Sequence, residues 1–554
     1  MHHASFLLLC WLALAAAAPH GSSSHPFDLG ASVSDPSSDL LTCLSELVDP
    51  SCGGLTILPS SDDASFTSAL NFSIPNLKFD EPQYAPPSFL LYPCSTQQVQ
   101  SIVVCATNSE WLLRVRSGGH GYTGQGSVAD DGFRFVLVDL MNLTRVTVDV
   151  AGSTAVVQAG ATLGEVYYHV SAASNDSLAF PAGTCPTVGI GGYLAGGGYG
   201  LLGRLHGLAA DHVLDCSLVA ANGSLLTRAN MSSDVFWALR GGGGGAYGIV
   251  VEWTVSLVPV SAVVTQFGAG VTGAAQVAAL LPQWQAFAPN APGDVYISCF
   301  LAVNGDGEVF ASFSGLALMT ASEVLSFVAA GFPLLNLSLA QTHEMSFIEA
   351  VVDFGAGMEP NPTVESLLDR AYYGKSYYAA KSDYVVSPLT AGANGGIETF
   401  LSALLAQPHA WAMLDPYGGA MSLVAPDALP FPHRAGNLFS IQYQTVWFQP
   451  SDEDSRRAGL RTIHDAMTPF VSSNPRRAYS NYPDADLGAA WNGTTTLTQN
   501  AQWGLPYFSG NFERLVEAKT QIDPANVFRN AQSTQVDQTR IRRRQERSVD
   551  VALE

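Results

Sequence analysis

The chain has 554 residues, a formal net charge of −22 and 47% hydrophobic residues, and 52 of its residues are glycine. This length exceeds what one compact hydrophobic core supports, so we expect two domains or more. The composition predicts a globular, loop-rich protein rather than a disordered one. The acidic balance makes nucleic acid and anionic membranes poor partners, so it either favours a neutral or cationic small-molecule substrate or serves solubility alone.

The N-terminus predicts a secretory signal peptide over residues 1–19. Residues 6–18 form an apolar run that is too short to span a bilayer, and residues 16–18 supply small side chains for cleavage. We therefore expect a secreted protein with no membrane segment, and a mobile segment over residues 20–40. Seven Asn-x-Ser/Thr sequons agree with this route, at Asn71, Asn142, Asn175, Asn222, Asn230, Asn336 and Asn492.

The first part of the mature chain predicts strands and helices in a mixed order. Ser95 or Thr96 can cap a helix with an apolar face, and a strand over Leu112–Val115 follows it. Further strands are predicted over Phe135–Leu140 and Ala155–Gln158. A second helix has apolar residues at spacings i, i+3, i+4 and i+7, namely Leu163, Val166, Tyr167 and Val170. Glycine loops between such elements indicate an α+β domain.

Two glycine-rich segments each carry one nucleophilic side chain. The first runs from Arg116 to Gly124 and contains His120; the second runs from Gly183 to Tyr193, continues to Gly200, and contains Cys185. Glycine lets backbone N–H groups approach a ligand closely because it has no Cβ. His120 and Cys185 could each bond to a flat cofactor held between them, although a lone histidine is more often structural.

A third glycine run follows Arg240 and includes Gly243, Gly245 and Gly248, which spell G-x-G-x-x-G. The dinucleotide-binding motif of that form must follow a strand and open a helix. Here a helical segment precedes the run and a strand, Ile249–Val255, follows it. The run is therefore either a flexible linker or a loop along a bound nucleotide.

From about Pro259 to Ser473 the composition changes. Strands such as Val295–Ala302 and Leu438–Trp447 alternate with amphipathic helices, which predicts a separate substrate domain. Gln442 and Gln444 alternate with apolar residues, so both should lie on one face of their strand. The chain then carries Tyr479-Ser480-Asn481-Tyr482 and, close to its end, Lys519 with Asp523-Pro524-Ala525-Asn526-Val527-Phe528.

Together these motifs resemble the berberine bridge enzyme-like family, within the vanillyl-alcohol oxidase type of FAD enzymes. The resemblance implies bicovalent FAD, with His120 bonded to the flavin 8α-methyl carbon and Cys185 to flavin C6. It implies an α+β fold in which an FAD-binding domain of the PCMH type is joined to an α+β substrate domain with an antiparallel sheet. The other cofactor-binding positions that it implies are Arg116, Ser117, Gly118, Gly119, Gly121, Tyr122, Gly183, Thr184, Val188, Gly189, Gly192, Tyr193, Gly248, Ile249 and Val250.

The resemblance also sets the expected boundaries. The FAD domain covers residues 41–258, the substrate domain 259–475, a C-terminal segment that returns to the FAD domain 476–536, and a solvated tail 537–554. Apart from Cys10 and Cys185, six cysteines allow fifteen pairings. The family pattern favours Cys43 with Cys105; Cys52 with Cys94 is a plausible second bridge, which leaves Cys216 and Cys299 as buried thiols.

Oxidation of an alcohol needs a hydride acceptor and a proton acceptor. Flavin N5 takes the hydride, and the resemblance to carbohydrate oxidases makes Tyr482 the proton acceptor with Asp415 as its relay. Ionising a tyrosine fully at pH 7 costs roughly 4 kcal/mol, so a relay that removes the proton avoids a free phenolate. Gln442 and Gln444 are expected to contact substrate hydroxyl groups, and Tyr122 to stack on a sugar ring. A packed aromatic at Tyr482 and a turn residue at Asp415 are the structural alternatives.

Two positions bear on the electron acceptor. Tyr193 stands where family members commonly have a histidine eight residues after the flavin cysteine, which affects the tuning of the flavin. Val188 is the small residue of oxygen-using members, so we expect an oxidase. The leading hypothesis is a monomeric oligosaccharide oxidase that uses O2. The alternatives are an oxidase of an alkaloid or phenolic alcohol, a dehydrogenase, and a flavoprotein without enzymatic function; no metal site is expected.

Overall fold

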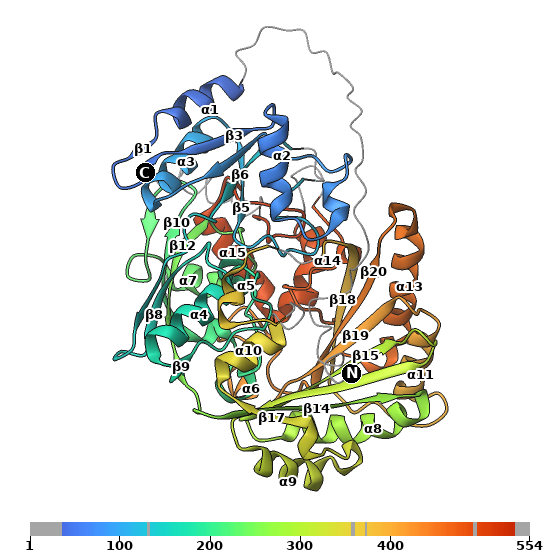
Figure 1. Ribbon diagram of the computed structural model, residues 1–554. Coiled ribbons are helices and arrows are strands. Elements are labelled where there is room, and N and C mark those ends of the chain that lie inside the picture. Colours follow the sequence, from blue (N-terminus) through green and yellow to red (C-terminus); the bar gives the residue numbers. More distant parts are fainter. Residues whose placement is uncertain (1–35, 130–132, 356–360, 372–373, 491–495, 538–554) are drawn as a thin grey trace, which may run out of the picture.

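The computed structural model describes residues 36–129, 133–355, 361–371, 374–490 and 496–537. The expected signal peptide, the sequon at Asn492 and residues 538–554 of the expected tail lie outside these ranges. The first part of the chain forms two sheets with flanking helices, and the middle forms one large antiparallel sheet. The last part returns to the first (Figure 1). The α+β fold expected from the sequence is confirmed.

The first sheet has four strands and delivers the chain to the His120 loop. Its order is β3 (Thr56–Pro59), β4 (Phe89–Tyr92), β6 (Phe135–Asp139) and β5 (Leu112–Arg116), with β4 and β5 parallel to β6. Helix α3 (Thr96–Asn108) packs against this sheet. The Ser95 side chain caps α3 by accepting a hydrogen bond from the Gln98 N–H. The apolar face predicted for this helix is buried, as expected.

The second sheet has five antiparallel strands, and the glycine run of residues 241–248 leads into its central strand. Its order is β11 (Leu225–Leu226), β10 (Val213–Val219), β12 (Ile249–Ser256), β8 (Thr154–Gln158) and β7 (Val146–Asp149). Helix α4 (Leu163–Ser174) begins with a capping box between Thr162 and Glu165. Helix α7 (Ser233–Leu239) precedes the glycine run and β12 follows it, so this run does not have the order of a dinucleotide-binding motif.

The N-terminal arm is ordered earlier than predicted. Residues Pro36–Ser45 form helix α1, although we expected residues 20–40 to be mobile. Leu40 and Leu44 are buried in the core beside α3. Disulfides join Cys43 to Cys105 and Cys52 to Cys94, as the resemblance led us to expect, and they fasten this arm to α3 and to the residues just before it. Cys216 and Cys299 are buried free thiols, also as expected.

The large sheet has seven antiparallel strands. Their order is β17 (Thr342–Met345), β14 (Val264–Thr272), β16 (Val309–Ala317), β15 (Val295–Val303), β19 (Ala410–Pro416), β20 (Phe439–Trp447) and β18 (Tyr377–Val385). Four helices cover one face and form a second core with it: α8 (Ala274–Phe287), α9 (Ala321–Gly331), α11 (Gly396–Leu405) and α13 (Glu453–Ala466) (Figure 1). The opposite face is directed toward the first part of the chain.

Two segments link these parts. Helix α10 (Phe347–Gly355), which follows β17, packs into the first core against α4. The C-terminal helices α14 (Leu497–Phe508) and α15 (Phe512–Ile522) join the same core, and α15 packs against α7. The domain boundaries stay predictions. Asp537, expected in the solvated tail, is instead buried, and its N–H donates to Thr520 Oγ1.

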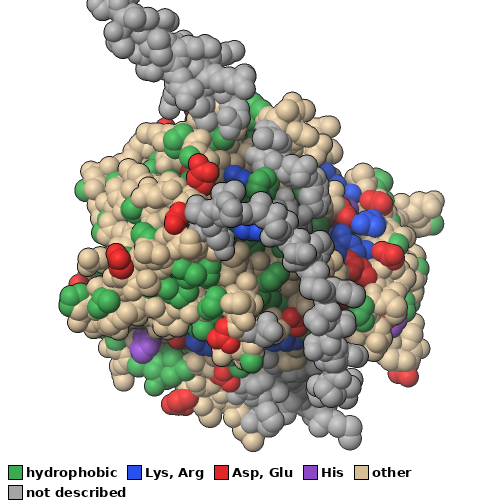
Figure 2. All heavy atoms as spheres, turned by 90° about the horizontal axis from the view of Figure 1, so that it is seen from above, with side chains coloured by type: hydrophobic (Ala, Val, Ile, Leu, Met, Phe, Trp, Pro, Cys, Tyr) green, Lys and Arg blue, Asp and Glu red, His purple; other side chains and the backbone are tan. Residues whose placement is uncertain are grey.

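The remaining elements are short connections. They are β1 (Val48–Asp49), β2 (Gly53–Gly54), α2 (Asp63–Phe72), β9 (Leu178–Ala179), α5 (Ile190–Ala195), α6 (Gly203–His206), β13 (Val258–Pro259) and α12 (Ala420–Leu423). Within the described ranges, every helix is too short or too polar to cross a membrane. Figure 2 shows basic side chains gathered among acidic ones at one edge of the molecule. Among the ion pairs of the described residues, Arg457 and Arg461 of α13 pair with Asp486.

Candidate active site

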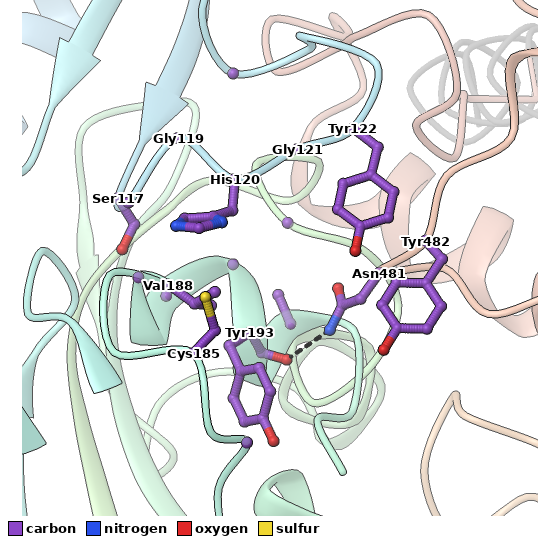
Figure 3. Close-up of a pocket in the computed structure, with 18 of the residues that line it drawn as sticks. Ser117, Gly119, His120, Gly121, Tyr122, Cys185, Val188, Tyr193, Asn481 and Tyr482 are labelled. Atoms are coloured by element: carbon purple, nitrogen blue, oxygen red, sulfur yellow. Dashed lines mark hydrogen bonds between the residues drawn. The ribbon is translucent and has the colours of Figure 1, made fainter. Parts of the chain in front are cut away.

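Both glycine segments border one cavity of about 480 Å³ that also reaches the large sheet and the C-terminal segment. In the close-up, His120 and Cys185 project from separate loops toward the same space (Figure 3). Tyr122 and Tyr482 lie at one end of that space. The cavity therefore has a loop-lined end, which includes the glycine run of residues 241–248, and an end lined by side chains of β19 and β20.

The two glycine segments touch through their backbones. A Cβ added at Gly118 would lie 2.2 Å from the Gly189 nitrogen, and one added at Gly189 would lie 2.1 Å from the Gly118 nitrogen. The adjacent Ser117 hydroxyl donates to the Ala159 carbonyl at 2.6 Å. Any side chain at either glycine would force the loops apart, so the distance between His120 and Cys185 depends on glycine here.

His120 is held by the opposite loop. Its Nε2 lies 2.8 Å from Thr187 Oγ1, two residues after Cys185. Burial lowers the pKa of His120 to about 4, so the imidazole is neutral at physiological pH. A neutral imidazole retains a lone pair that can bond to an electrophilic carbon. Cys185 is half-buried, as a thiol must be to meet a ligand in the cavity.

Several glycines border open space rather than packed protein. A Cβ added at Gly192, Gly243 or Gly245 would meet no atom within 4 Å. Gly243 and Gly245 also have φ values of 102° and 66°, which favour glycine. These positions form a cradle into which backbone can approach a flat dinucleotide, so the residues present fit FAD.

Most, but not all, of the other predicted cofactor-binding positions line the cavity. Those that line it are Gly119, Gly121, Gly183, Thr184, Gly248 and Val250. Ile249 does not line it, because its side chain is fully buried in the first core. Arg116 borders the cavity, but its guanidinium binds Asp139 at 2.7 Å and the Leu70 carbonyl at 3.0 Å. Its charge therefore stabilises the end of β5.

At the far end, Tyr122 and Tyr482 stack with ring centroids 5.5 Å apart and planes 5° from parallel. The Gln442 amide donates to the Tyr122 hydroxyl at 2.9 Å and lies 3.4 Å from Gln444 Oε1. Gln442 and Gln444 thus share a strand face that lines the cavity, as predicted. One face of the Tyr122 ring stacks on Tyr482, and Tyr378 packs against the ring edge to face; the contact of Tyr122 with a sugar ring stays a prediction.

The expected direct pair of Tyr482 and Asp415 is not formed. The Tyr199 hydroxyl lies between them, 2.9 Å from Tyr482 Oη and 2.9 Å from Asp415 Oδ2. The Tyr296 hydroxyl donates to Asp415 Oδ1 at 2.5 Å. The two side chains do not meet because Asp415 lies at the buried end of β19 and the Tyr199 phenol occupies the space between it and Tyr482.

The electrostatics of this chain of hydroxyls follow from burial. Burial raises the pKa of Asp415, and its two hydrogen bonds from Tyr199 and Tyr296 oppose that rise. Burial raises the pKa of Tyr482 well above its ordinary value, with additional contributions from Tyr122 and Asp415. A lasting Tyr482 phenolate is therefore strongly disfavoured, whereas Asp415 is the group in this chain that can hold a negative charge.

Tyr193, the departure from the family pattern, has a specific contact. Its hydroxyl donates to the Tyr199 carbonyl at 2.7 Å, and its carbonyl accepts from the Asn481 amide at 3.0 Å. This hydrogen bond fixes the backbone of Tyr199. It also uses the only hydroxyl proton of Tyr193, so the Tyr193 hydroxyl cannot donate to another group at the same time. Burial raises the pKa of Tyr193 well above its ordinary value.

Sequence reasoning missed three residues of this end. Tyr199 lies within the second glycine segment, where its place before Gly200 was a usable signal. Tyr296 and Trp411 are single aromatic residues within alternating strands and gave no signal. Trp411 lines the cavity beside Gln444, its cross-strand neighbour, and its buried indole N–H has no hydrogen-bond partner among the described residues.

Comparison with known proteins agrees with this geometry. Residues 87–228 match the family described as FAD binding domain, and residues 478–535 match the family described as Berberine and berberine like. Fold and site together define an FAD-dependent oxidoreductase. The loop-lined end of the cavity falls largely within the first match, and Tyr482 within the second.

The chain belongs to the berberine bridge enzyme-like family. It is 41% identical to berberine bridge enzyme-like D-1 of Nicotiana tabacum, over 89% of this chain and 90% of the relative. It is 39% identical to tetrahydroberberine oxidase of Berberis wilsoniae, over 85% and 89%. Phl p 4, described as a grass pollen allergen with glucose dehydrogenase activity, superposes with a TM-score of 0.84 at 37% identity, over 90% and 99%.

Proposed function

We propose that this protein is a secreted oxidase that holds FAD through bonds at both His120 and Cys185. We propose further that it oxidises the C1 hydroxyl of a reducing oligosaccharide to a lactone and passes the electrons to O2, which gives hydrogen peroxide. The observation that carries the reaction is the hydroxyl chain from Tyr482 through Tyr199 to Asp415.

The geometry of the loops supports double attachment. His120 and Cys185 project from opposite loops into one cavity, and the backbone contact of Gly118 with Gly189 fixes their spacing (Figure 3). Thr187 holds Nε2 of His120, which orients the ring. When bound, the flavin supplies the acceptor for a hydride from the substrate carbon.

The residues at the other end move the proton. Tyr199 donates its hydroxyl proton to Asp415, so its oxygen accepts from the Tyr482 hydroxyl. The Tyr482 oxygen then accepts the proton of the substrate hydroxyl. Tyr482 passes its own proton to Tyr199, and Tyr199 passes one to Asp415. One proton leaves the substrate and one arrives on Asp415, while both tyrosines remain neutral.

The lining of the cavity supports a neutral, hydroxylated substrate. Gln442 and Gln444 offer amide groups near the proton acceptor. Arg116 is the only Lys or Arg among the described lining residues, and its charge is paired with Asp139. A carboxylate substrate would find no free cation there, whereas a sugar would find hydrogen-bonding partners.

Val188 supports O2 as the electron acceptor. It lines the cavity on the same loop as Cys185, three residues further on. A double variant of Phl p 4, in which one substitution introduces valine and the other histidine, is described as a glucose oxidase, whereas the protein itself is described as a dehydrogenase. This chain has valine at Val188 but tyrosine instead of histidine at Tyr193. The competing proposal is therefore a dehydrogenase.

The main competing substrate is an alkaloid or phenolic alcohol, which the relative named tetrahydroberberine oxidase favours. Peroxide formation is measured with glucose, cellobiose, maltose, lactose and chitobiose, and with benzylic and allylic alcohols, each under air. A sugar that forms peroxide supports the proposal. Peroxide formation with the alcohols alone would contradict the sugar substrate and favour an alkaloid or phenolic alcohol. Flavin reduction without peroxide would indicate a dehydrogenase.

Secretion, glycosylation and a monomeric state complete the proposal. Five of the sequon asparagines are exposed, namely Asn142, Asn175, Asn222, Asn230 and Asn336, whereas Asn71 is half-buried within α2. Two disulfides suit an oxidising compartment. Secretion into the medium with glycans on the exposed sites is the expected result on expression of the full chain.

A further inference from the structure

The C-terminal segment contains a fully buried ion pair that the proposed reaction does not use. Lys519 and Asp523 lie one helical turn apart and both are 0% exposed. The Lys519 ammonium donates to Asp523 Oδ2, to the Ala246 carbonyl and to the Phe528 carbonyl, each at 2.6 Å. All three protons of the ammonium therefore have acceptors.

One of these contacts reaches the cofactor cavity. Ala246 belongs to the glycine run of residues 241–248, which lines the cavity between α7 and β12. Four glycines in this run have positive φ values, so the run has little conformational preference of its own: Gly241, Gly243, Gly245 and Gly248. The Ala195 carbonyl accepts from Gly243 N–H at 2.8 Å, and Lys519 fixes the run three residues further on.

The other partner reaches the strand that carries the His120 loop. Asp523 accepts hydrogen bonds from the N–H groups of Val527 and Phe528, both at 2.9 Å. This places the segment alongside β5, where the Leu113 N–H donates to the Val527 carbonyl at 3.3 Å. β5 leads directly into the His120 loop. The ion pair thus contacts one wall of the cavity directly, at Ala246, and reaches the strand that leads to the other wall through Val527 and Phe528.

We propose that Lys519 and Asp523 are positioning residues for the cofactor, which hold the glycine run and β5 at the separation that FAD requires. A buried ion pair is weak support for stability, because desolvation of the two charges offsets most of their attraction. Burial lowers the pKa of Lys519 and the carboxylate of Asp523 opposes that shift. The two charged side chains hold the backbone of Ala246, Val527 and Phe528 through hydrogen bonds, which an apolar pair of side chains could not form.

The test compares Lys519→Met, Asp523→Asn and the double variant with an ion pair elsewhere. Met keeps the length of Lys519 but donates no hydrogen bond, and Asn removes the charge of Asp523 while keeping an acceptor for one of the two backbone N–H groups, which donate to different carboxylate oxygens. The control is Arg476→Met, because the partly exposed Arg476 forms an ion pair with the fully buried Asp383 of β18 and neither residue lines the cavity. Three quantities are measured on purified full-length protein: flavin per protein, thermal midpoint, and hydrogen exchange of residues 241–248.

Lys519→Met is expected to lower flavin per protein severalfold and to speed exchange of the glycine run about tenfold, because a charge-assisted hydrogen bond to the run is lost. The double variant removes the unpaired carboxylate, so its thermal midpoint should recover while flavin content and exchange do not. Arg476→Met should lower the midpoint alone.

Wild-type flavin content and exchange in Lys519→Met would overturn the proposal. Recovery of both quantities in the double variant, or an equal loss in Arg476→Met, would also overturn it and leave a purely structural role. If the wild-type protein itself carried no flavin, the proposed function would fail instead. The exchange of residues 241–248 would then still decide whether Lys519 holds the run.

Discussion

The two ends of the cavity are built in different ways. The loop-lined end depends on backbone contacts between short contiguous segments, such as Gly118 against Gly189. The sheet-lined end depends on side chains from β15, β19, β20 and the C-terminal segment, which meet only after folding. The first end tolerates no change of residue size at its contacts. The second can change residue by residue, which separates cofactor attachment from substrate choice.

The largest loss of bound flavin is expected from adding a Cβ at the contact between the two loops. Gly189→Ala should reduce flavin per protein by at least about tenfold, since the Cβ would lie 2.1 Å from Gly118 nitrogen and overpacking costs roughly 1–3 kcal/mol or more. Absorbance ratios of purified protein measure it. The control is Gly305→Ala, which lies outside the cavity lining and where a Cβ would meet no atom within 4 Å. Equal flavin content in both variants would contradict the backbone argument.

The next effect belongs to the sheet-lined end. Tyr482→Phe should slow flavin reduction by about 10²–10⁴-fold, because general-base assistance is worth that much, while both covalent links persist. Stopped-flow absorbance measures the reduction rate, and acid precipitation with the colour retained in the pellet measures the links. A rate within about twofold of wild type would remove Tyr482 from the mechanism.

Tyr199→Phe should give a smaller loss, about tenfold to a hundredfold, since it breaks the hydroxyl chain but leaves the Tyr482 hydroxyl in place. A solvent deuterium isotope effect on flavin reduction distinguishes proton transfer from packing. Loss of rate without any change in that isotope effect would assign Tyr199 to packing alone.

The pH profile tests Asp415. Burial raises its pKa above the ordinary value of 3.8, and it accepts a proton only while ionised. The acid limb of kcat/KM should therefore lie above pH 3.8, with activity lost as the pH falls through the raised pKa. Asp415→Asn should lower the rate and remove this limb. An unchanged limb in that variant would mean that another group controls it.

The smallest effect is expected at Gln444. Gln444→Leu should raise KM for an oligosaccharide by about three- to tenfold with kcat nearly unchanged, as one net hydrogen bond of roughly 0.5–1.5 kcal/mol is lost. Steady-state kinetics with cellobiose and glucose measure it. A fall in kcat as large as that in KM would place Gln444 in the chemical step.

The sequence predicted the loop-lined end well because its information is local. His120, Cys185 and their glycines lie in two contiguous runs, and the structure brings both into one cavity. At the sheet-lined end it correctly predicted the shared face of Gln442 and Gln444, which follows from strand alternation. It failed on the direct contact of Tyr482 with Asp415, because no local pattern could place the Tyr199 phenol between them.

Two errors elsewhere have the same origin. The segment before Cys43 lacks a hydrophobic pattern long enough to predict α1, yet a disulfide and two leucines fix it against α3. Ile249 follows Gly248 directly, but strand alternation turns its side chain into the core and leaves Val250 at the cavity. In both cases the deciding contact comes from a distant part of the chain.

The two faces of the large sheet have different roles: one face packs in the core that maintains the fold, and the other lines the cavity that receives the substrate. In β19, Ala410, Ala412 and Leu414 lie in the helix-covered core, whereas Trp411 and Asp415 line the cavity. Mutations at the second set can alter the recognised molecule while the first set preserves the scaffold. A library confined to alternate codons of β19 and β20 would therefore sample new substrate preferences while most of its members still fold and bind flavin.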